Sequence, residues 1–139
     1  MLDPCIIGAP KCGTSSLFRW ITAHPQISRP ENGKELFFFM DPGHPLIKEP
    51  NVHTASADAY DSLFPGISST CRLESTTHYL YQDTARELLA QMEGQPLIVV
   101  VLRDPVQCVW SSFQYTRNNL ARMDPSLSFF QYVELDAAR

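Results

Sequence analysis

The sequence predicts a three-layer α/β fold with a central parallel sheet. Short apolar runs alternate with segments of helical periodicity along most of the 139 residues. The 11 prolines and 6 glycines are concentrated between these segments, where they mark turns and loops. Strands that alternate with helices pair in parallel, because each helix returns the chain to the end of the sheet where the next strand begins.

The first strand, loop and helix are predicted close to the N-terminus. Residues 5–7 are apolar and include two isoleucines, which favours a strand. Residues 8–13 begin and end with glycine and predict a loop. Residues 14–23 predict a helix, because Leu17 and Ile21 lie one turn apart on the same face.

The middle of the chain predicts less regular structure. Residues 24–56 are rich in His, Pro and Asn and predict a long loop, with one short buried apolar element at 36–39. Residues 57–64 predict a helix that Pro65 and Gly66 end.

Three further elements are predicted in the second half. Residues 72–74 predict a short strand, and residues 84–92 predict an amphipathic helix. The six apolar residues 97–102 predict a strand that is buried on both faces, as in a parallel sheet.

Composition limits the classes of function. The length fits one domain, residues 1–139, and the formal net charge of −4 argues against a general nucleic-acid binder. No stretch reaches the roughly 20 apolar residues that span a bilayer, and no signal-peptide pattern is present. The four cysteines form no CxxC pair, so we expect no structural metal site, while free thiols and disulfides both stay open: Cys5, Cys12, Cys71 and Cys108.

The first chemical motif is the loop and helix start at residues 8–16, Gly-Ala-Pro-Lys-Cys-Gly-Thr-Ser-Ser. Backbone N–H groups at a helix N-terminus, hydroxyls and the ammonium of Lys11 together make a phosphate site. The lysine precedes Gly13, so this is not a Walker A loop, in which Gly-Lys is followed by Ser or Thr. The alternative is an ordinary turn in which Gly13 and Thr14 only begin the helix.

A second candidate site follows the strand at 97–102. Arg103 stands at its carboxyl end, where ligands bind in open α/β sheets, and a guanidinium there can hold a phosphate. Asp104 and Pro105 predict the start of a helix that continues toward residue 122, and Ser111 lies two turns into it. The alternatives are that Arg103 pairs with Asp104 or another carboxylate, and that Ser111 is an ordinary helix residue.

These motifs resemble the sulfotransferases that use 3′-phosphoadenosine 5′-phosphosulfate (PAPS), particularly the carbohydrate and heparan sulfate branch and its bacterial relatives. Their 5′-phosphosulfate loop has a Lys-x-Gly-Thr-[ST] pattern and is commonly followed by His-Pro, as at residues 11–15 and 24–25. Their 3′-phosphate motif is an apolar strand that ends in Arg-Asp-Pro, with a serine eight residues after the arginine, as at residues 99–105 and Ser111. The resemblance covers about residues 5 to 120 and implies a P-loop-like fold that is incomplete at the C-terminus.

The resemblance implies PAPS as co-substrate, without a metal. Arg103 and Ser111 would hold the 3′-phosphate. The residues implied in binding the 5′-phosphosulfate are Lys11, Cys12, Gly13, Thr14, Ser15 and Ser16.

Residues 34–39 look like the family's Lys-Glu-x-x-Phe-Phe element, in which the glutamate is the catalytic base. Sulfuryl transfer to an alcohol needs a base for the hydroxyl proton and a cation for the charge that develops, and Glu35 and Lys11 fit these roles. Leu-Phe stands where Pro-His is common, Glu31 is the fallback base, and Lys34 is expected to contact donor or acceptor. The alternative is a solvated charged loop.

Residues 74–79 resemble the family's Glu-x-[ST]-Pro-x-Tyr segment, which lines the acceptor side of the cleft. Thr76 and Tyr79 are therefore expected to line the substrate, while Thr77 replaces the proline. His78 is interpreted as a surface or packing residue, because a single histidine beside a strand end seldom acts as a base.

The predicted function is transfer of a sulfuryl group from PAPS to an acceptor hydroxyl, which we expect on a carbohydrate. The alternatives are a P-loop-type nucleotide kinase, which the missing Gly-Lys-[ST] order disfavours, and a truncated, non-catalytic nucleotide-binding fragment. The compartment stays open between the cytoplasm and, for a piece of a longer anchored protein, the Golgi lumen.

Overall fold

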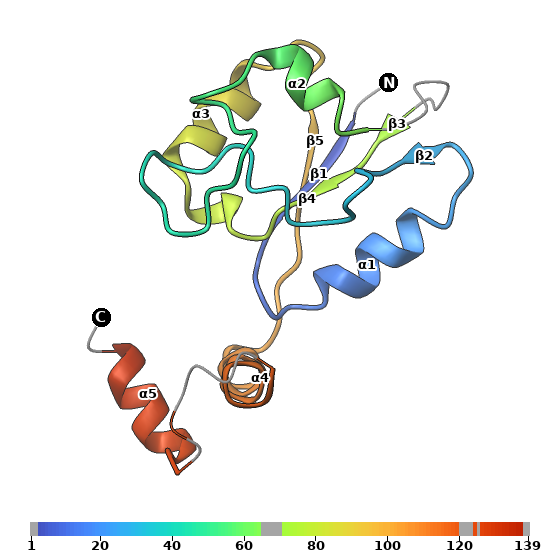
Figure 1. The fold of residues 1–139 in the computed structure, drawn as a ribbon. Coiled ribbons are helices and arrows are strands. Elements are labelled where there is room, and N and C mark those ends of the chain that lie inside the picture. Colours follow the sequence, from blue (N-terminus) through green and yellow to red (C-terminus); the bar gives the residue numbers. More distant parts are fainter. Residues whose placement is uncertain (1–2, 65–70, 120–123, 125, 138–139) are drawn as a thin grey trace. The chain divides into compact units, whose positions relative to one another are not determined.

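A computed structural model describes residues 3–64, 71–119, 124 and 126–137 (Figure 1). The chain divides into two compact units, Met1–Leu102 and Arg103–Arg139. The first unit contains the sheet and the phosphate-loop motif, and the second contains helices α4 and α5.

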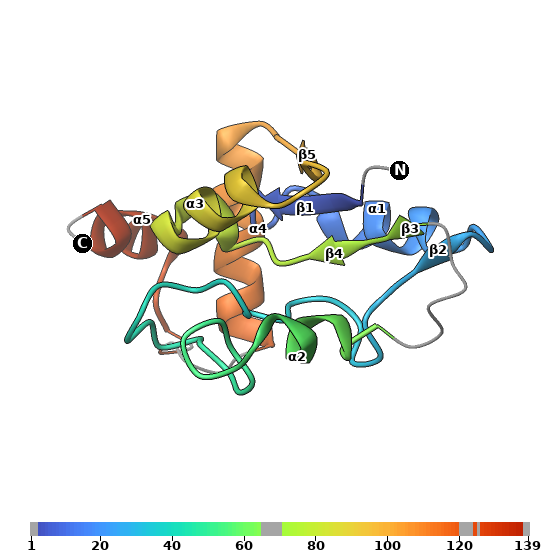
Figure 2. The same cartoon turned by 90° about the horizontal axis from the view of Figure 1, so that it is seen from above.

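The first unit is built on a parallel sheet of the order β4-β1-β5. Strand β1 (Pro4–Gly8) is central and pairs in parallel with β4 (Glu74–Ser75) and β5 (Leu97–Val100), as Figure 2 shows. A second, two-stranded parallel sheet pairs β2 (Ile27–Ser28) with β3 (Cys71–Arg72). The predicted α/β fold with a parallel sheet is therefore confirmed.

Alternate side chains of β1 point to two separate cores, which makes the unit three-layered. Ile6 is fully buried and packs with Phe18 of helix α1 (Thr14–Ile21). Cys5 is buried on the opposite face, where it packs with Leu89 of helix α3 (Asp83–Gln91). The predicted helices at 14–23 and 84–92 are thus confirmed within two residues at their ends.

The segment before helix α2 (Ala57–Asp61), predicted as a loop over residues 24–56, is irregular except for the two-residue strand β2, which was not predicted. Of the apolar element predicted at 36–39, residues 37–39 are buried together with Met40, whereas Leu36 is only partly buried. The helix predicted for 57–64 ends at Asp61, and Pro65 and Gly66 lie outside the described residues.

The strand predicted at 72–74 is in fact two short strands. Leu73 lies between β3 and β4, and its N–H donates to the carbonyl of Ser28 at 2.8 Å. The chain therefore passes from one sheet to the other at this residue.

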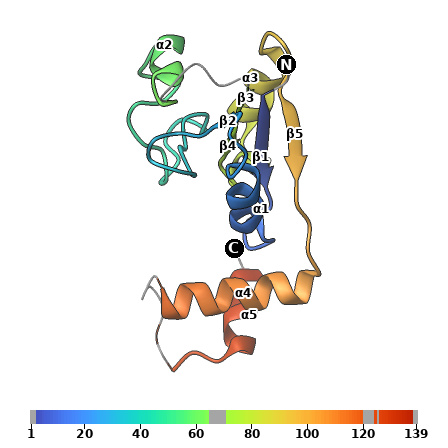
Figure 3. The ribbon, with the colours of Figure 1, turned by 90° about the vertical axis from the view of Figure 1, so that its right-hand side faces the viewer.

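The prediction that residues 97–102 are buried on both faces is wrong. Leu97 is 52% exposed and Leu102 is 78% exposed, and Ile98 and Val100 are exposed as well. Figure 3 shows β5 at the edge of the sheet, and within the described residues it pairs with β1 alone. An edge position explains the exposure, because an apolar run identifies a strand but not its place in the sheet.

The second unit consists of α4 (Pro105–Asn118) and α5 (Phe129–Ala137), and α5 was not predicted. Asp104 caps α4, since its Oδ1 accepts the N–H of Gln107 at 2.9 Å, and Pro105 takes the first helical position, both as predicted. The part of the chain that the structure describes contains no helix long and apolar enough to cross a membrane. The four cysteines all lie within the described residues, and no disulfide joins them.

Candidate active site

The phosphate loop leads from β1 into α1. Gly13 has a φ of 95°, a left-handed conformation that glycine adopts without steric cost, and the N–H groups of Ser16 and Leu17 bond back to its carbonyl as the helix begins. Thr14 is buried, whereas Gly13, Ser15 and Ser16 are exposed. The loop therefore presents backbone and hydroxyl groups at the positive end of a helix, which suits an anion.

Lys34 joins this loop to the predicted catalytic residue. Its Nζ lies 3.4 Å from Thr14 Oγ1 and 3.2 Å from Ser15 Oγ, and it forms an ion pair of 2.8 Å with Glu35 Oε1. Lys34 is 20 residues from Thr14 and 19 residues from Ser15 in the sequence, and its ammonium group connects the two motifs.

The Glu35 carboxylate is held from its other side by Thr77. The Thr77 N–H donates to Oε2 at 3.2 Å, and the Thr77 hydroxyl donates to Oε1 at 3.1 Å. The sequence interpretation missed this role, although it noted that Thr77 stands where the family pattern has proline. That substitution was the available signal, because proline has no N–H to donate.

The backbone at Glu35 is also special. Its φ is 66°, in the left-handed region that costs a non-glycine residue roughly 1–2 kcal/mol. Its N–H donates to the carbonyl of Ser75 at 2.8 Å, and Lys48 Nζ donates to its carbonyl at 3.4 Å. Contacts from two other segments therefore hold Glu35 in a conformation that it would not adopt on its own.

His78, interpreted from the sequence as a surface or packing residue, lies next to the predicted base, Glu35. Its Nδ1 is 4.0 Å from Glu35 Oε2, and its ring centroid is 5.7 Å from that of Phe37. Burial lowers the pKa of His78 below its usual value of 6.5, so the ring is neutral near pH 7. His78 therefore borders the site as an uncharged group.

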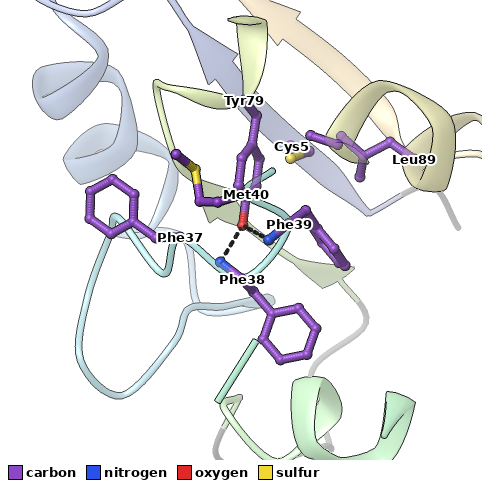
Figure 4. Close-up of a cluster of buried hydrophobic side chains, with 8 residues drawn as sticks. Cys5, Phe37, Phe38, Phe39, Met40, Tyr79 and Leu89 are labelled. Carbon is purple, nitrogen blue, oxygen red and sulfur yellow. Dashed lines mark hydrogen bonds between the residues drawn. The ribbon is translucent and has the colours of Figure 1, made fainter. Parts of the chain in front are cut away.

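Thr76 and Tyr79, the two residues predicted to line the substrate, are both buried in this structure, and their assignment to the substrate stays a prediction. Thr76 is 0% exposed and Tyr79 is 2% exposed. The Tyr79 hydroxyl instead accepts the N–H groups of Phe38 and Phe39, as Figure 4 shows. Both hydroxyls donate to the carboxylate of Glu74, so in this structure they connect Glu74 to the loop at residues 37–39.

The remaining predicted residues have less defined surroundings. Lys11 and Cys12 are half-buried within the loop, and Lys11 has a left-handed φ of 64°. Glu31, the fallback base, is exposed, and its N–H donates to the carbonyl of Leu63. Among the described residues no group of three or more His, Cys, Asp or Glu side chains is placed to hold a metal ion.

The two residues predicted to hold the 3′-phosphate belong to the second unit. Arg103 is exposed and donates through Nε and Nη2 to Gln107 Oε1, at 3.3 and 3.1 Å. Ser111 is half-buried on α4, eight residues further along. Their assignment to a phosphate stays a prediction.

An anion loop at a helix N-terminus, joined through one ammonium group to a carboxylate, is an arrangement typical of α/β enzymes that transfer charged groups. A profile of the sulfotransferase domain matches residues 3–138, and the chain belongs to this family of transferases.

Similar proteins include heparan sulfate enzymes and a bacterial sulfotransferase. The bifunctional heparan sulfate N-deacetylase/N-sulfotransferase 3 of Homo sapiens is 24% identical over 140 residues, which cover 96% of this chain and 15% of that protein. The corresponding enzyme 1 of Caenorhabditis elegans is 31% identical over 127 residues, covering 88% of this chain and 13% of that protein.

The crystal structure of a sulfotransferase from Alicyclobacillus acidocaldarius aligns with a TM-score of 0.72 and 28% identity. The alignment covers 94% of this chain and 55% of that chain. The chain thus spans about half of this solved structure and less than a sixth of the two heparan sulfate enzymes.

Proposed function

We propose that this chain forms the donor-binding part of an enzyme that transfers a sulfuryl group from PAPS to an acceptor hydroxyl. The observation that carries the proposal is the position of Lys34, whose ammonium contacts two hydroxyl groups of the phosphate loop and the carboxylate of Glu35. A donor anion in the loop and a base at Glu35 would then lie on either side of one cation.

The residues of the loop fit the donor. The exposed residues Gly13, Ser15 and Ser16, with the cation of Lys11 in the same loop and the cation of Lys34 beside it, are proposed to provide hydrogen bonds and charge for a 5′-phosphosulfate. Arg103 and Ser111 are proposed to hold the 3′-phosphate, which distinguishes PAPS from an ordinary 5′-nucleotide.

The proposed reaction is an in-line displacement at sulfur. The acceptor oxygen attacks sulfur, the bond from sulfur to the phosphate oxygen breaks, and adenosine 3′,5′-bisphosphate leaves. Glu35 takes the hydroxyl proton, and Lys11 and Lys34 neutralise charge on the sulfuryl and leaving oxygens. Thr77 keeps the carboxylate aimed by binding both of its oxygens.

The acceptor is proposed to be a carbohydrate hydroxyl. The names of the two heparan sulfate relatives favour a second candidate, a carbohydrate amine, because both are called N-sulfotransferases. Glu35 would serve either reaction, since an amine also loses a proton when it is sulfated.

The test is transfer of radiolabelled sulfur from PAPS to an unsulfated glycosaminoglycan that carries free amines. The same polymer with its amines acetylated is assayed beside it. Label on both polymers supports a hydroxyl acceptor, and label on the free-amine polymer alone supports the amine. Transfer of phosphate from ATP with magnesium, without transfer of sulfur, would instead support the kinase alternative.

A further inference from the structure

We propose that Tyr79, oriented by Glu74, is a positioning residue for Glu35. It would act through the backbone of residues 37–39 and would never touch the substrate. The inference extends the function proposed above, and it rests on the hydrogen bonds between the segment at 74–79 and the loop that carries Glu35.

The two segments are joined along their backbones. The N–H of Glu35 donates to the Ser75 carbonyl at 2.8 Å, and the N–H of Phe37 donates to Thr76 Oγ1 at 3.4 Å. The next two N–H groups, of Phe38 and Phe39, both donate to the Tyr79 hydroxyl, at 2.9 and 3.1 Å. Four of five consecutive N–H groups are thus bound by one neighbouring segment.

The loop needs such support because its conformation is strained. Glu35 and Phe37 have φ values of 66° and 56°, which residues other than glycine rarely adopt. Such conformations persist only where the surroundings determine them. The hydrogen bonds on both sides of Phe37 provide that determination and so fix the direction of the Glu35 side chain.

Proton counting shows why Tyr79 needs Glu74. The Tyr79 oxygen already accepts two N–H groups, so its single proton must be donated elsewhere. Glu74 Oε1 takes it at 2.6 Å and also accepts from Thr76 Oγ1 at 3.2 Å. Glu74 therefore sets the orientation of the two hydroxyls that bind the loop.

The hydroxyls around Glu74 favour its ionised form. Burial raises the pKa of Glu74 above its usual value, and the hydroxyl donors oppose that shift. Tyr60 donates to Oε2, and Tyr79 and Thr76 donate to Oε1. The ionised carboxylate accepts from all three hydroxyls at once, so each has an acceptor.

Tyr60 provides a matched control within the same cluster. Like Tyr79, it bonds to the Glu74 carboxylate, and its ring packs against Phe38 and Phe39 with centroids 5.1 and 4.9 Å apart. The Tyr60 hydroxyl donates to Glu74 Oε2 and not to the loop backbone. Tyr→Phe at the two positions therefore removes a hydroxyl from the same buried carboxylate, but only one of the two holds the loop.

The experiment compares Tyr79→Phe with Tyr60→Phe in the full chain by amide hydrogen exchange and by transfer kinetics. In Tyr79→Phe the Phe38 and Phe39 amides each lose their hydrogen bond, which predicts about tenfold faster exchange at both, and little change is expected in Tyr60→Phe. We expect kcat to fall about tenfold in Tyr79→Phe alone, with the KM for PAPS unchanged.

A second pair of variants, at Glu74, guards against a general loss of packing. Glu74→Gln keeps a carbonyl oxygen for Tyr79 and is expected to retain slow exchange at Phe38 and Phe39, whereas Glu74→Leu is expected to lose it. Equal exchange at these amides in both Tyr→Phe variants would overturn the inference. Exchange needs no turnover, so a wild-type chain that transfers no sulfur would contradict the proposed function while the positioning role is still decided.

Discussion

Glu35 and Glu74 place two carboxylates on the two sides of one loop, in contrasting surroundings. The Glu35 side chain is 24% exposed and contacts the ammonium group of Lys34 and the hydroxyl and N–H of Thr77. Glu74 is 2% exposed and is surrounded by the hydroxyls of Tyr60, Thr76 and Tyr79. A glutamate that is partly exposed and paired with a lysine is suited to proton transfer, whereas a glutamate that is buried among hydroxyl groups is suited to holding neighbouring segments in place.

The largest effect is expected from Glu35→Gln, which removes the proposed base and keeps nearly the same side-chain shape. Loss of a general base costs about 10²- to 10⁴-fold in kcat. Affinity for adenosine 3′,5′-bisphosphate should not change, because the nucleotide is proposed to contact the loop and not Glu35. Steady-state kinetics with a parallel binding titration checks both, and retained turnover would assign the base to another residue.

Glu74→Leu is expected to lower the free energy of unfolding. It leaves the hydroxyls of Tyr60 and Tyr79 buried without their acceptor, at about 1–3 kcal/mol for each unsatisfied group. Urea unfolding measures the change in the free energy of unfolding. Glu74→Gln is the control and should lose much less, since it keeps one acceptor; equal losses would show that volume, not hydrogen bonding, matters at this position.

Lys34→Ala tests whether the Lys34 ammonium group contributes to binding of the donor nucleotide. Loss of a charged contact to the phosphosulfate should weaken binding of the bisphosphate about tenfold. Lys48→Ala is the matched control, because Lys48 donates to the Glu35 carbonyl, whereas Lys34 contacts the hydroxyls of the phosphate loop. The same loss of affinity in both variants would indicate a general charge effect and not a contact.

The smallest effect concerns His78 and the dependence of stability on pH. Burial lowers the pKa of His78 below 6.5, while Glu35 opposes the shift and His44 and Lys34 add to it. The unfolded chain therefore binds more protons than the folded chain below pH 6.5, and stability falls as the pH drops from 6.5 toward the lowered value. In His78→Gln this part of the slope should vanish, which chemical unfolding at pH 5 and pH 8 measures; an unchanged slope would contradict it.

The sequence predicted the parts of the fold that depend on local pattern. The phosphate loop, helices α1, α3 and α4 and the cap at Asp104 follow from glycine placement, helical periodicity and one capping side chain. The edge position of β5 could not be predicted, because hydrophobicity identifies a strand but not the number of its neighbours.

The candidate site was predicted by residue type better than by role. Lys34 contacts the phosphate loop and forms an ion pair with Glu35, and the family resemblance implied that these residues would act in one reaction. The burial of Thr76 and Tyr79 and the contact of Thr77 with Glu35 depend on the path of the loop at 34–40 across β4, which no local pattern encodes.

The most direct test of the donor site is a calorimetric titration of the chain with adenosine 3′,5′-bisphosphate, run beside 5′-AMP and beside ATP with magnesium. Clear preference for the bisphosphate is the predicted result, because the 3′-phosphate is the group that Arg103 and Ser111 are proposed to hold. Equal affinity for 5′-AMP, or preference for ATP with magnesium, would contradict it.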